Sequence, residues 1–182
     1  MEGGINAWNG VVAEGMPEES LAFFASARSA GEYVALAWLL EDGTNLFYRS
    51  LGEMAAEPEA AALFQELAAA EEHHKALLDE LHLRLARTPL DPGALRVAIS
   101  GPESRRYIEG GISLGEAIHR AEGRKTADIL EMSMTLEANA FDRYLFMRQE
   151  TADPGVKAAF TTLSNEEKRH LERLAALSAR LT

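Results

Sequence analysis

The chain repeats itself: its two halves align without a gap at an offset of 96 residues, which takes Glu41 to Glu137. The recurring residues are mostly of interior type, and they recur at helical spacing. The matched pairs include Glu41/Glu137, Tyr48/Tyr144, Pro58/Pro154, Phe64/Phe160, Leu67/Leu163, Glu71/Glu167, His74/His170 and Leu78/Leu174. An unbroken repeat of this kind predicts an all-α protein built from two similar helical hairpins.

Each half is predicted to contain a helix, a short turn and a second helix. The first helix should begin at Ser29, which has the spacing of a capping box with the residue three positions later. Turns are expected at 55–58 and 151–155. Pro58 and Pro154 then lie in the first turn of the following helix, where a missing N–H costs nothing.

The two hairpins are separated by a segment of about 39 residues, 86–124, that is rich in proline and glycine. A structureless loop of this length would be unusual inside a compact domain. We therefore expect a long crossover between the second and third helices, with a short amphipathic helix near 113–121. The predicted organisation is one antiparallel four-helix bundle over 29–182, preceded by a separate segment, 1–28.

The amino-acid composition excludes some classes of function and disfavours others. The chain has 182 residues, a net charge of −11 and no cysteine, so disulfides and thiol nucleophiles are excluded within it. The acidic balance disfavours nucleic acid as a partner, because phosphate binding needs clustered basic residues. We see no signal peptide and no apolar run long enough for a bilayer, and so expect a cytoplasmic protein without a membrane partner.

The repeat also predicts a layer of polar residues inside the bundle. Glu41 lies 15 residues before the first turn and Glu71 lies 15 after it, so both reach one level of an antiparallel hairpin. The second hairpin repeats this arrangement, and a histidine follows each second glutamate by three residues, on the same helix face. The candidate metal ligands are therefore Glu41, Glu71, His74, Glu137, Glu167 and His170.

Four ionised carboxylates in an apolar core are costly unless cations accompany them. Two metal ions would meet this need, and Glu71 and Glu167 can bridge them. Oxygen-rich ligation with some imidazole favours iron or manganese over structural zinc. The residues themselves predict two ions of iron or manganese as cofactors, with zinc as a possible substitute, and the same di-metal centre as the candidate catalytic site.

Tyr48 and Tyr144 each follow a candidate glutamate by seven residues, roughly 10 Å further along the same helix face. They can be packing residues, or they can act around the metal ligands as hydrogen-bond donors to a ligand carboxylate or as a one-electron relay. Both interpretations stay open at this point.

Other acids and histidines near the motifs are expected to lie outside the ligand set. Residues expected on the surface or facing elsewhere are His73, His82, His119, Glu72 and Glu166. Glu166 is the least unfavourable alternative ligand among them.

Residues 29–182 resemble the rubrerythrin branch of the ferritin-like superfamily. The matching strings are LLEDGTNLFY (39–48), LAAAEEHH (67–74), LEANAFDRY (136–144) and LSNEEKRH (163–170). The resemblance implies a ferritin-like four-helix bundle with a di-iron site that reduces hydrogen peroxide or activates dioxygen, usually in a homodimer.

Two features depart from that family. Rubrerythrins usually carry a further glutamate one turn from the single glutamate of the third helix, where this chain has Met134 and Ala140. The redox-linked ligand exchange of the family is therefore in doubt here. The chain also lacks a rubredoxin domain, so electrons are expected from another redox protein.

The string GGINAWNG (3–10) is similar to the end of a rhodanese domain. It indicates that residues 1–28 are the remnant and linker of a rhodanese-like domain in a fusion. The alternative function is thus an iron-binding or sensory module attached to a sulfurtransferase, without turnover of its own. The favoured function is a di-iron peroxidase or oxidase with peroxide or dioxygen as substrate.

Overall fold

The computed structural model describes Phe24, Ala27 and residues 29–181. This part of the chain forms six α-helices and one short 3₁₀-helix, and its only β-type pairing is an isolated bridge between Tyr107 and Ser113. None of the described helices is both long and apolar enough to span a bilayer. The all-helical structure is consistent with a ferritin-like bundle.

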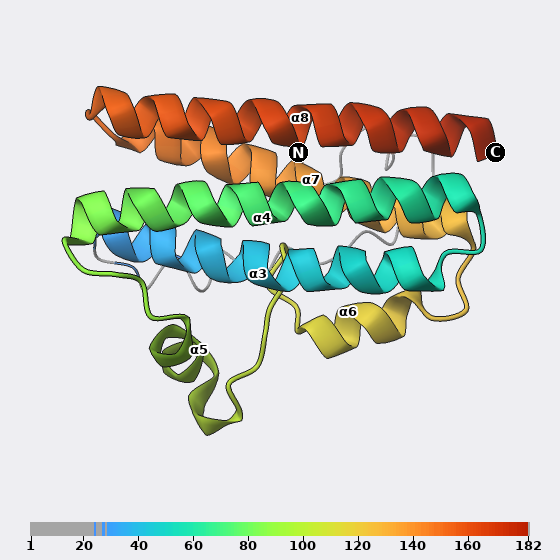
Figure 1. Ribbon diagram of the computed structural model, residues 1–182, viewed down its shortest axis with the longest axis horizontal. Coiled ribbons are helices and arrows are strands. Elements are labelled where there is room, and N and C mark those ends of the chain that lie inside the picture. Colours follow the sequence, from blue (N-terminus) through green and yellow to red (C-terminus); the bar gives the residue numbers. More distant parts are fainter. Residues whose placement is uncertain (1–23, 25–26, 28, 182) are drawn as a thin grey trace, which may run out of the picture.

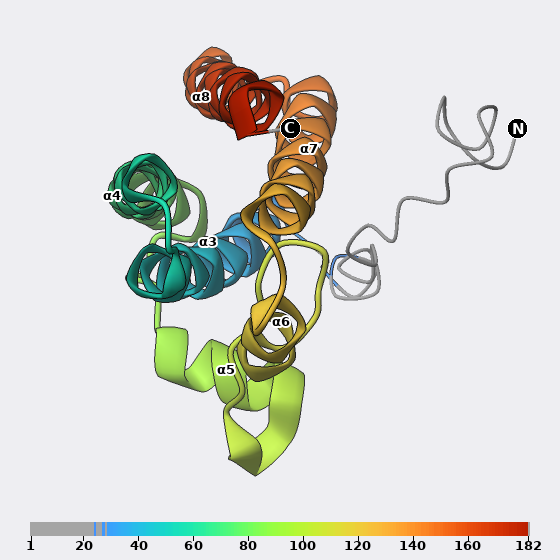
Figure 2. The ribbon, with the colours of Figure 1, turned by 90° about the vertical axis from the view of Figure 1, so that its right-hand side faces the viewer.

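Four long helices run side by side along the molecule (Figure 1). Their bounds are α3 Ala30–Met54, α4 Pro58–Ala86, α7 Thr126–Glu150 and α8 Pro154–Leu181. Helix α3 packs along α4, and α7 packs along α8. The end-on view shows these two pairs facing each other (Figure 2), and the most extensive contact between the pairs is that of α4 with α8.

The helix ends follow from local chemistry. Ser29 caps α3 by accepting a hydrogen bond from the Glu32 amide at 3.2 Å, as its capping-box spacing predicts. Pro58 and Pro154 open α4 and α8, where proline is favoured because its amide would be unpaired anyway. The short turns that precede them make each helix pair antiparallel.

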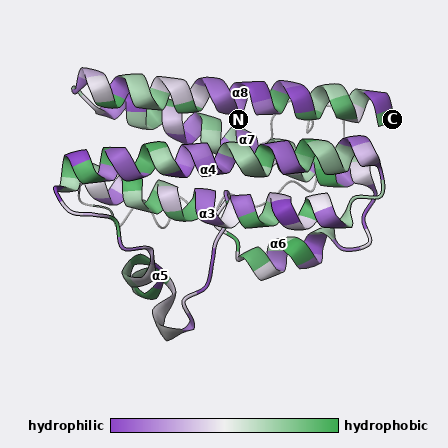
Figure 3. Cartoon of the chain, in the orientation of Figure 1, coloured by the Kyte–Doolittle hydropathy of each residue, from purple (hydrophilic) through white to green (hydrophobic). Residues whose placement is uncertain are grey.

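Hydrophilic and hydrophobic residues alternate along all four long helices (Figure 3), as expected when one side of each helix faces a core. The repeat supplies matched core residues from both halves. Fully buried examples are Val34, Phe47, Leu51, Phe64, Leu67, Leu78, Leu130, Leu136, Leu163 and Leu174. This apolar packing surrounds the level at which the predicted polar layer lies.

The crossover contains more structure than the sequence indicated. Besides α6 (Leu114–Ala121), which Ser113 caps as expected, it forms α5 (Pro92–Ser100) and a 3₁₀ turn (Gly101–Glu103). Helices α5 and α6 both contact α3 and lie outside the bundle, on the side away from α8 (Figure 2). The crossover helices therefore pack on the first hairpin, while the loop between them also reaches α7 through the ion pair of Glu109 with Arg143.

A tight loop between α5 and α6 presses against α3. Its backbone closes through Ile108 N–H to Ile112 C=O at 3.0 Å, and Gly110 and Gly111 adopt φ values of 82° and 81°, which favour glycine. A Cβ at Gly43 of α3 would overlap the Tyr107 carbonyl. Glycine at this position thus lets the loop approach the helix backbone closely.

The expected rhodanese-like remnant, 1–28, lies outside the described residues apart from Phe24 and Ala27. Phe24 is buried and stacks on Tyr33, with ring centroids 5.5 Å apart. It packs with Leu36 and Leu40 of α3.

Candidate metal centre

All six candidate ligands lie together inside the bundle, and each is at most 7% exposed. They form two overlapping groups whose ligand atoms lie within 4.8 Å of one another. The first group is Glu41, Glu71, His74 and Glu167, and the second is Glu71, Glu137, Glu167 and His170. Glu71 and Glu167 belong to both groups, so their carboxylates occupy the positions expected of bridging ligands.

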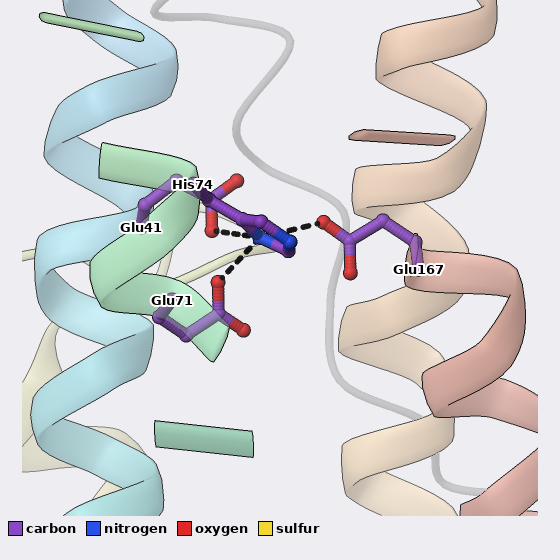
Figure 4. A group of neighbouring side chains, drawn as sticks. All are labelled: Glu41, Glu71, His74 and Glu167. Atoms are coloured by element: carbon purple, nitrogen blue, oxygen red, sulfur yellow. Dashed lines mark hydrogen bonds and ion pairs between the residues drawn. The ribbon is translucent and has the colours of Figure 1, made fainter. Parts of the chain in front are cut away.

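The His74 ring is surrounded by carboxylates. Its Nδ1 lies 3.0 Å from Glu71 Oε2, 3.2 Å from Glu167 Oε1 and 3.5 Å from Glu41 Oε2. Figure 4 shows these three side chains converging on the ring from α3, α4 and α8. The nitrogen that faces the cluster is therefore Nδ1.

His170 repeats this arrangement in the second half. Its Nδ1 lies 3.0 Å from Glu137 Oε2 and 3.1 Å from Glu167 Oε2. The two imidazole rings are 5.6 Å apart between centroids. Glu167 thus directs one oxygen to each histidine, and its carboxylate spans the two halves of the centre.

Tyr48 and Tyr144 reach across the bundle to the opposite hairpin. The Tyr48 hydroxyl donates to Glu137 Oε1, and the Tyr144 hydroxyl donates to Glu41 Oε1. Both rings also stack on phenylalanines, Tyr48 on Phe64 at 6.2 Å and Tyr144 on Phe160 at 6.1 Å. The structure therefore gives each tyrosine both a packing contact and a contact with a candidate ligand.

The electrostatics of the cluster divide the four carboxyls into two kinds. Burial and the neighbouring Glu41 carboxylate raise the pKa of Glu71 well above its ordinary value. Burial also raises the pKa of Glu167, and the charges of Glu137 and Glu41 add to that effect. The shared carboxylates are thus the ones that resist ionisation.

The two outer carboxyls shift in the other direction. Burial alone would raise the pKa of Glu41, but close contacts with Glu71 and His74, and the charges of His74 and Arg143, outweigh it and lower the pKa. Burial likewise opposes ionisation of Glu137, while its contacts with His170 lower its pKa overall.

Burial disfavours the charged form of both histidines, yet the surrounding carboxylates reverse the effect. They raise the pKa of His74 well above its ordinary value and also raise that of His170. The two histidines and the two shared carboxyls therefore respond to buried negative charge, whereas Glu41 and Glu137 respond to the neighbours that stabilise their ionised forms.

This donor set fits metal ions. Among the described residues, Glu41 Oε2 and Glu167 Oε1 are buried without a hydrogen-bond donor, and both face His74 Nδ1. Buried carboxylate oxygens of this kind are favourable when a cation pairs with them. Four carboxylates with two imidazole nitrogens suit iron or manganese.

Two side chains near the centre, Arg143 and Glu109, were missed by the sequence argument, and a third, Glu166, was considered only as a poor second choice for a ligand. Arg143 donates to Glu41 Oε1 at 3.0 Å and also pairs with the buried Glu109. Glu166, which we expected to face elsewhere, instead contacts His74 Nε2 at 3.0 Å. It does so because α8 lies beside α4 and residue 166 is on the side of α8 that faces that helix.

A sequence signal for these residues did exist. Arg143 and Glu166 both break the repeat, since their counterparts 96 residues earlier are Phe47 and Ala70. Glu109 has no counterpart at all because the crossover occurs once.

The remaining histidines lie outside the cluster, as expected. His73 is exposed, His82 is half-buried, and the exposed His119 pairs with Glu122 at 3.2 Å.

A buried layer of four glutamates and two histidines contributed by four helices could hold metal, and it has the arrangement known from di-metal carboxylate bundles. Comparison with protein families is in agreement: residues 128–182 match the Rubrerythrin family model. This segment covers almost all of α7 and α8 and holds Glu137, Glu167 and His170. Searches of curated proteins and of solved structures gave no match.

Proposed function

We propose that this chain is a ferritin-like di-iron carboxylate protein that reduces hydrogen peroxide or activates dioxygen. The observation that carries the proposal is the pair of overlapping ligand groups that share Glu71 and Glu167. The Rubrerythrin match, which covers one of the two Glu-x-x-His motifs, supports iron as the metal of this proposal. The internal repeat extends the same chemistry to the first half.

Two iron ions held by the six residues would supply the electrons and open coordination positions for reducing the substrate. The protein's own groups have separate roles. Glu71 and Glu167 span the two positions, and Tyr48 and Tyr144 fix the outer oxygens of Glu137 and Glu41.

The apolar shell supports this chemistry by excluding bulk water. Leu67, Leu78, Leu163 and Leu174 are fully buried one turn before or after the Glu-x-x-His motifs. A dry surrounding strengthens the interaction of carboxylates with cations.

The chain contains no cysteine, and we propose that a separate redox protein supplies the electrons. We also propose that the chain acts as a homodimer. The net charge of −11 favours a donor with a complementary basic surface.

The first test is metal content. The purified chain should bind two iron ions, and His74→Ala should lower the content while the neighbouring exposed His73→Ala does not. Equal iron content in both variants would contradict the assignment of the site.

The second test is reactivity. Stopped-flow mixing of the Fe(II)-loaded chain with hydrogen peroxide should oxidise the iron much faster than free Fe(II). If iron binds but its oxidation is no faster, the proposed turnover is wrong, and metal binding without turnover becomes the better description.

A further inference from the structure

The six candidate ligands recur at the 96-residue offset, but some residues that contact these ligands, such as Arg143 and Glu166, do not. We propose that Glu166 is a positioning residue that makes the Glu41–His74 position bind its metal ion more tightly than the Glu137–His170 position. This inference rests on the proposed function, since it assumes that the cluster binds two ions.

The first observation concerns the two nitrogens of His74. Nδ1 faces the cluster, while Nε2 lies 3.0 Å from Glu166 Oε2 on the neighbouring hairpin. A carboxylate at Nε2 favours the tautomer that carries its proton there, which leaves the Nδ1 lone pair directed at the metal position. It also fixes the ring orientation and makes the imidazole a stronger ligand.

Glu166 is held in place for this role. Its side chain is 33% exposed, and Glu166 Oε1 lies 3.6 Å from Arg169 Nη2. One carboxylate oxygen therefore pairs with a surface arginine while the other contacts the buried His74 ring.

The second observation concerns Glu41. Its Oε1 accepts hydrogen bonds from both Arg143 and Tyr144, so the carboxylate is fixed with Oε2 towards His74 Nδ1. Arg143 is oriented in turn by Glu109 and lies over the Tyr144 ring, 4.6 Å from its centroid. The charge of Glu109 offsets that of Arg143, so the arginine orients Glu41 without adding net positive charge to the site.

The second half has no equivalent for these groups. The residue 96 positions before Glu166 is Ala70, and the residue 96 positions before Arg143 is Phe47. Neither alanine nor phenylalanine carries a side-chain oxygen or nitrogen. The Glu41–His74 position is therefore pre-organised at both its glutamate and its histidine, and the other position shares only the tyrosine contact.

Pre-organised ligands bind a metal ion more tightly because less order must be imposed on binding. Loss of a group that orients a ligating histidine typically lowers metal affinity by about 10- to 100-fold. Glu166→Ala places at this site the residue that the first half has, so it should remove the advantage of the Glu41–His74 position.

The experiment uses anaerobic calorimetric titration of the whole chain with Fe(II). His170→Ala retains the Glu41–His74 position, and His74→Ala retains the other. The His170→Ala chain should bind its single Fe(II) more tightly than the His74→Ala chain. Glu166→Ala should then lower the affinity of the His170→Ala chain by about 10- to 100-fold and leave the His74→Ala chain unchanged.

Further variants separate positioning from general effects. Glu166→Gln keeps an oxygen that can accept from Nε2–H and should restore part of the affinity. Glu172→Ala on the same helix removes an exposed carboxylate whose nearest cation is 3.9 Å away, and it should change neither affinity. In the intact six-ligand chain, Glu166→Ala should weaken the first Fe(II) bound and spare the second.

Equal affinities in the two half-site chains, or an equal loss in both on Glu166→Ala, would overturn this inference while leaving the di-iron site intact. Absence of Fe(II) binding in the wild-type chain would instead overturn the proposed function.

Discussion

The two halves of the metal centre have the same candidate ligands and different surroundings. Glu41 and Glu137 each accept from a tyrosine of the opposite hairpin. Only Glu41 also accepts from an arginine, Arg143, which itself pairs with Glu109 of the crossover. The halves thus agree in the ligands and tyrosines that the repeat encodes, and they differ at Arg143 and Glu166, where the repeat is broken, and in the crossover that carries Glu109.

The part of this difference that involves Glu109 has a topological cause. Two repeated hairpins in one chain need a single connection, and here it packs on α3 and contributes α5, α6 and the loop that carries Glu109. In the part of the chain that the structure describes, no second connection packs on α7 in the same way. A centre that is symmetric in its ligands therefore becomes asymmetric in the groups that hold them.

The substitution with the largest expected effect removes a carboxylate that both halves of the centre share. Glu167→Ala deletes the carboxylate that contacts both His74 and His170, so both ions should be lost, because each position loses one of the two carboxylates that the positions share. Glu137→Ala should affect mainly one position. Iron content per chain, measured after anaerobic loading, distinguishes the two variants. Retention of one tightly bound ion in Glu167→Ala would show that the halves are independent.

The substitution with the next largest expected effect removes Arg143, which has no counterpart in the other half. Arg143→Phe introduces the residue that the first half has at this point, and it removes the cation that faces Glu41 and Glu109. Loss of one partner from a buried ion pair typically costs about 3–5 kcal/mol. Urea unfolding of the chain without added metal should show a decrease of this size in the free energy of unfolding.

A double variant supplies the control for this prediction. Glu109→Gln in the Arg143→Phe background removes the second charge and should recover part of the lost stability. A loss below about 1 kcal/mol for Arg143→Phe would mean that the pair behaves as a solvent-exposed one.

A smaller effect concerns the contact that brings the crossover onto α3. Gly43→Ala should displace the loop, since a Cβ there would overlap the Tyr107 carbonyl, and overpacking of this kind costs about 1–3 kcal/mol. Gly115→Ala is the matched control, because a Cβ at Gly115 meets no atom within 4 Å. In thermal unfolding, Gly115→Ala should leave the midpoint temperature unchanged or raise it, whereas Gly43→Ala should lower the midpoint temperature.

Much of the fold could be predicted because it depends on local patterns. The capping box at Ser29, the prolines at 58 and 154, and the repeat of apolar residues locate the four long helices to within a few residues. Placing Glu41 and Glu71 at one level needed only the helical rise per residue. That the six residues bind metal remains a prediction.

The rest could not be predicted because it depends on tertiary contacts without a periodic signal. Helix α5 lies in a segment rich in proline and glycine, and Glu109 reaches its buried position only through the loop at 107–113. The contact of Glu166 with His74 depends on how closely α8 approaches α4, and no pattern within one helix encodes that distance.

The smallest expected effect is the difference in stability between the variants of Tyr48 and Tyr144. Tyr48→Phe and Tyr144→Phe each remove one hydrogen bond to a buried carboxylate, but Glu41 keeps Arg143 as a donor to the same oxygen. Leaving a buried acceptor unsatisfied costs about 1–3 kcal/mol. Tyr48→Phe should therefore lower the free energy of unfolding by about 1 kcal/mol more than Tyr144→Phe.

This comparison is well controlled because the substitutions keep the aromatic stacks on Phe64 and Phe160. Urea unfolding of both variants under identical conditions, without added metal, measures the difference directly. Introducing Arg143→Phe into each variant sharpens it, since the two tyrosines should become equal once the arginine that distinguishes the halves is gone. Equal losses in the single variants would mean that Arg143 does not compensate for Tyr144, and the asymmetry would then reside in Glu166 and His74 alone.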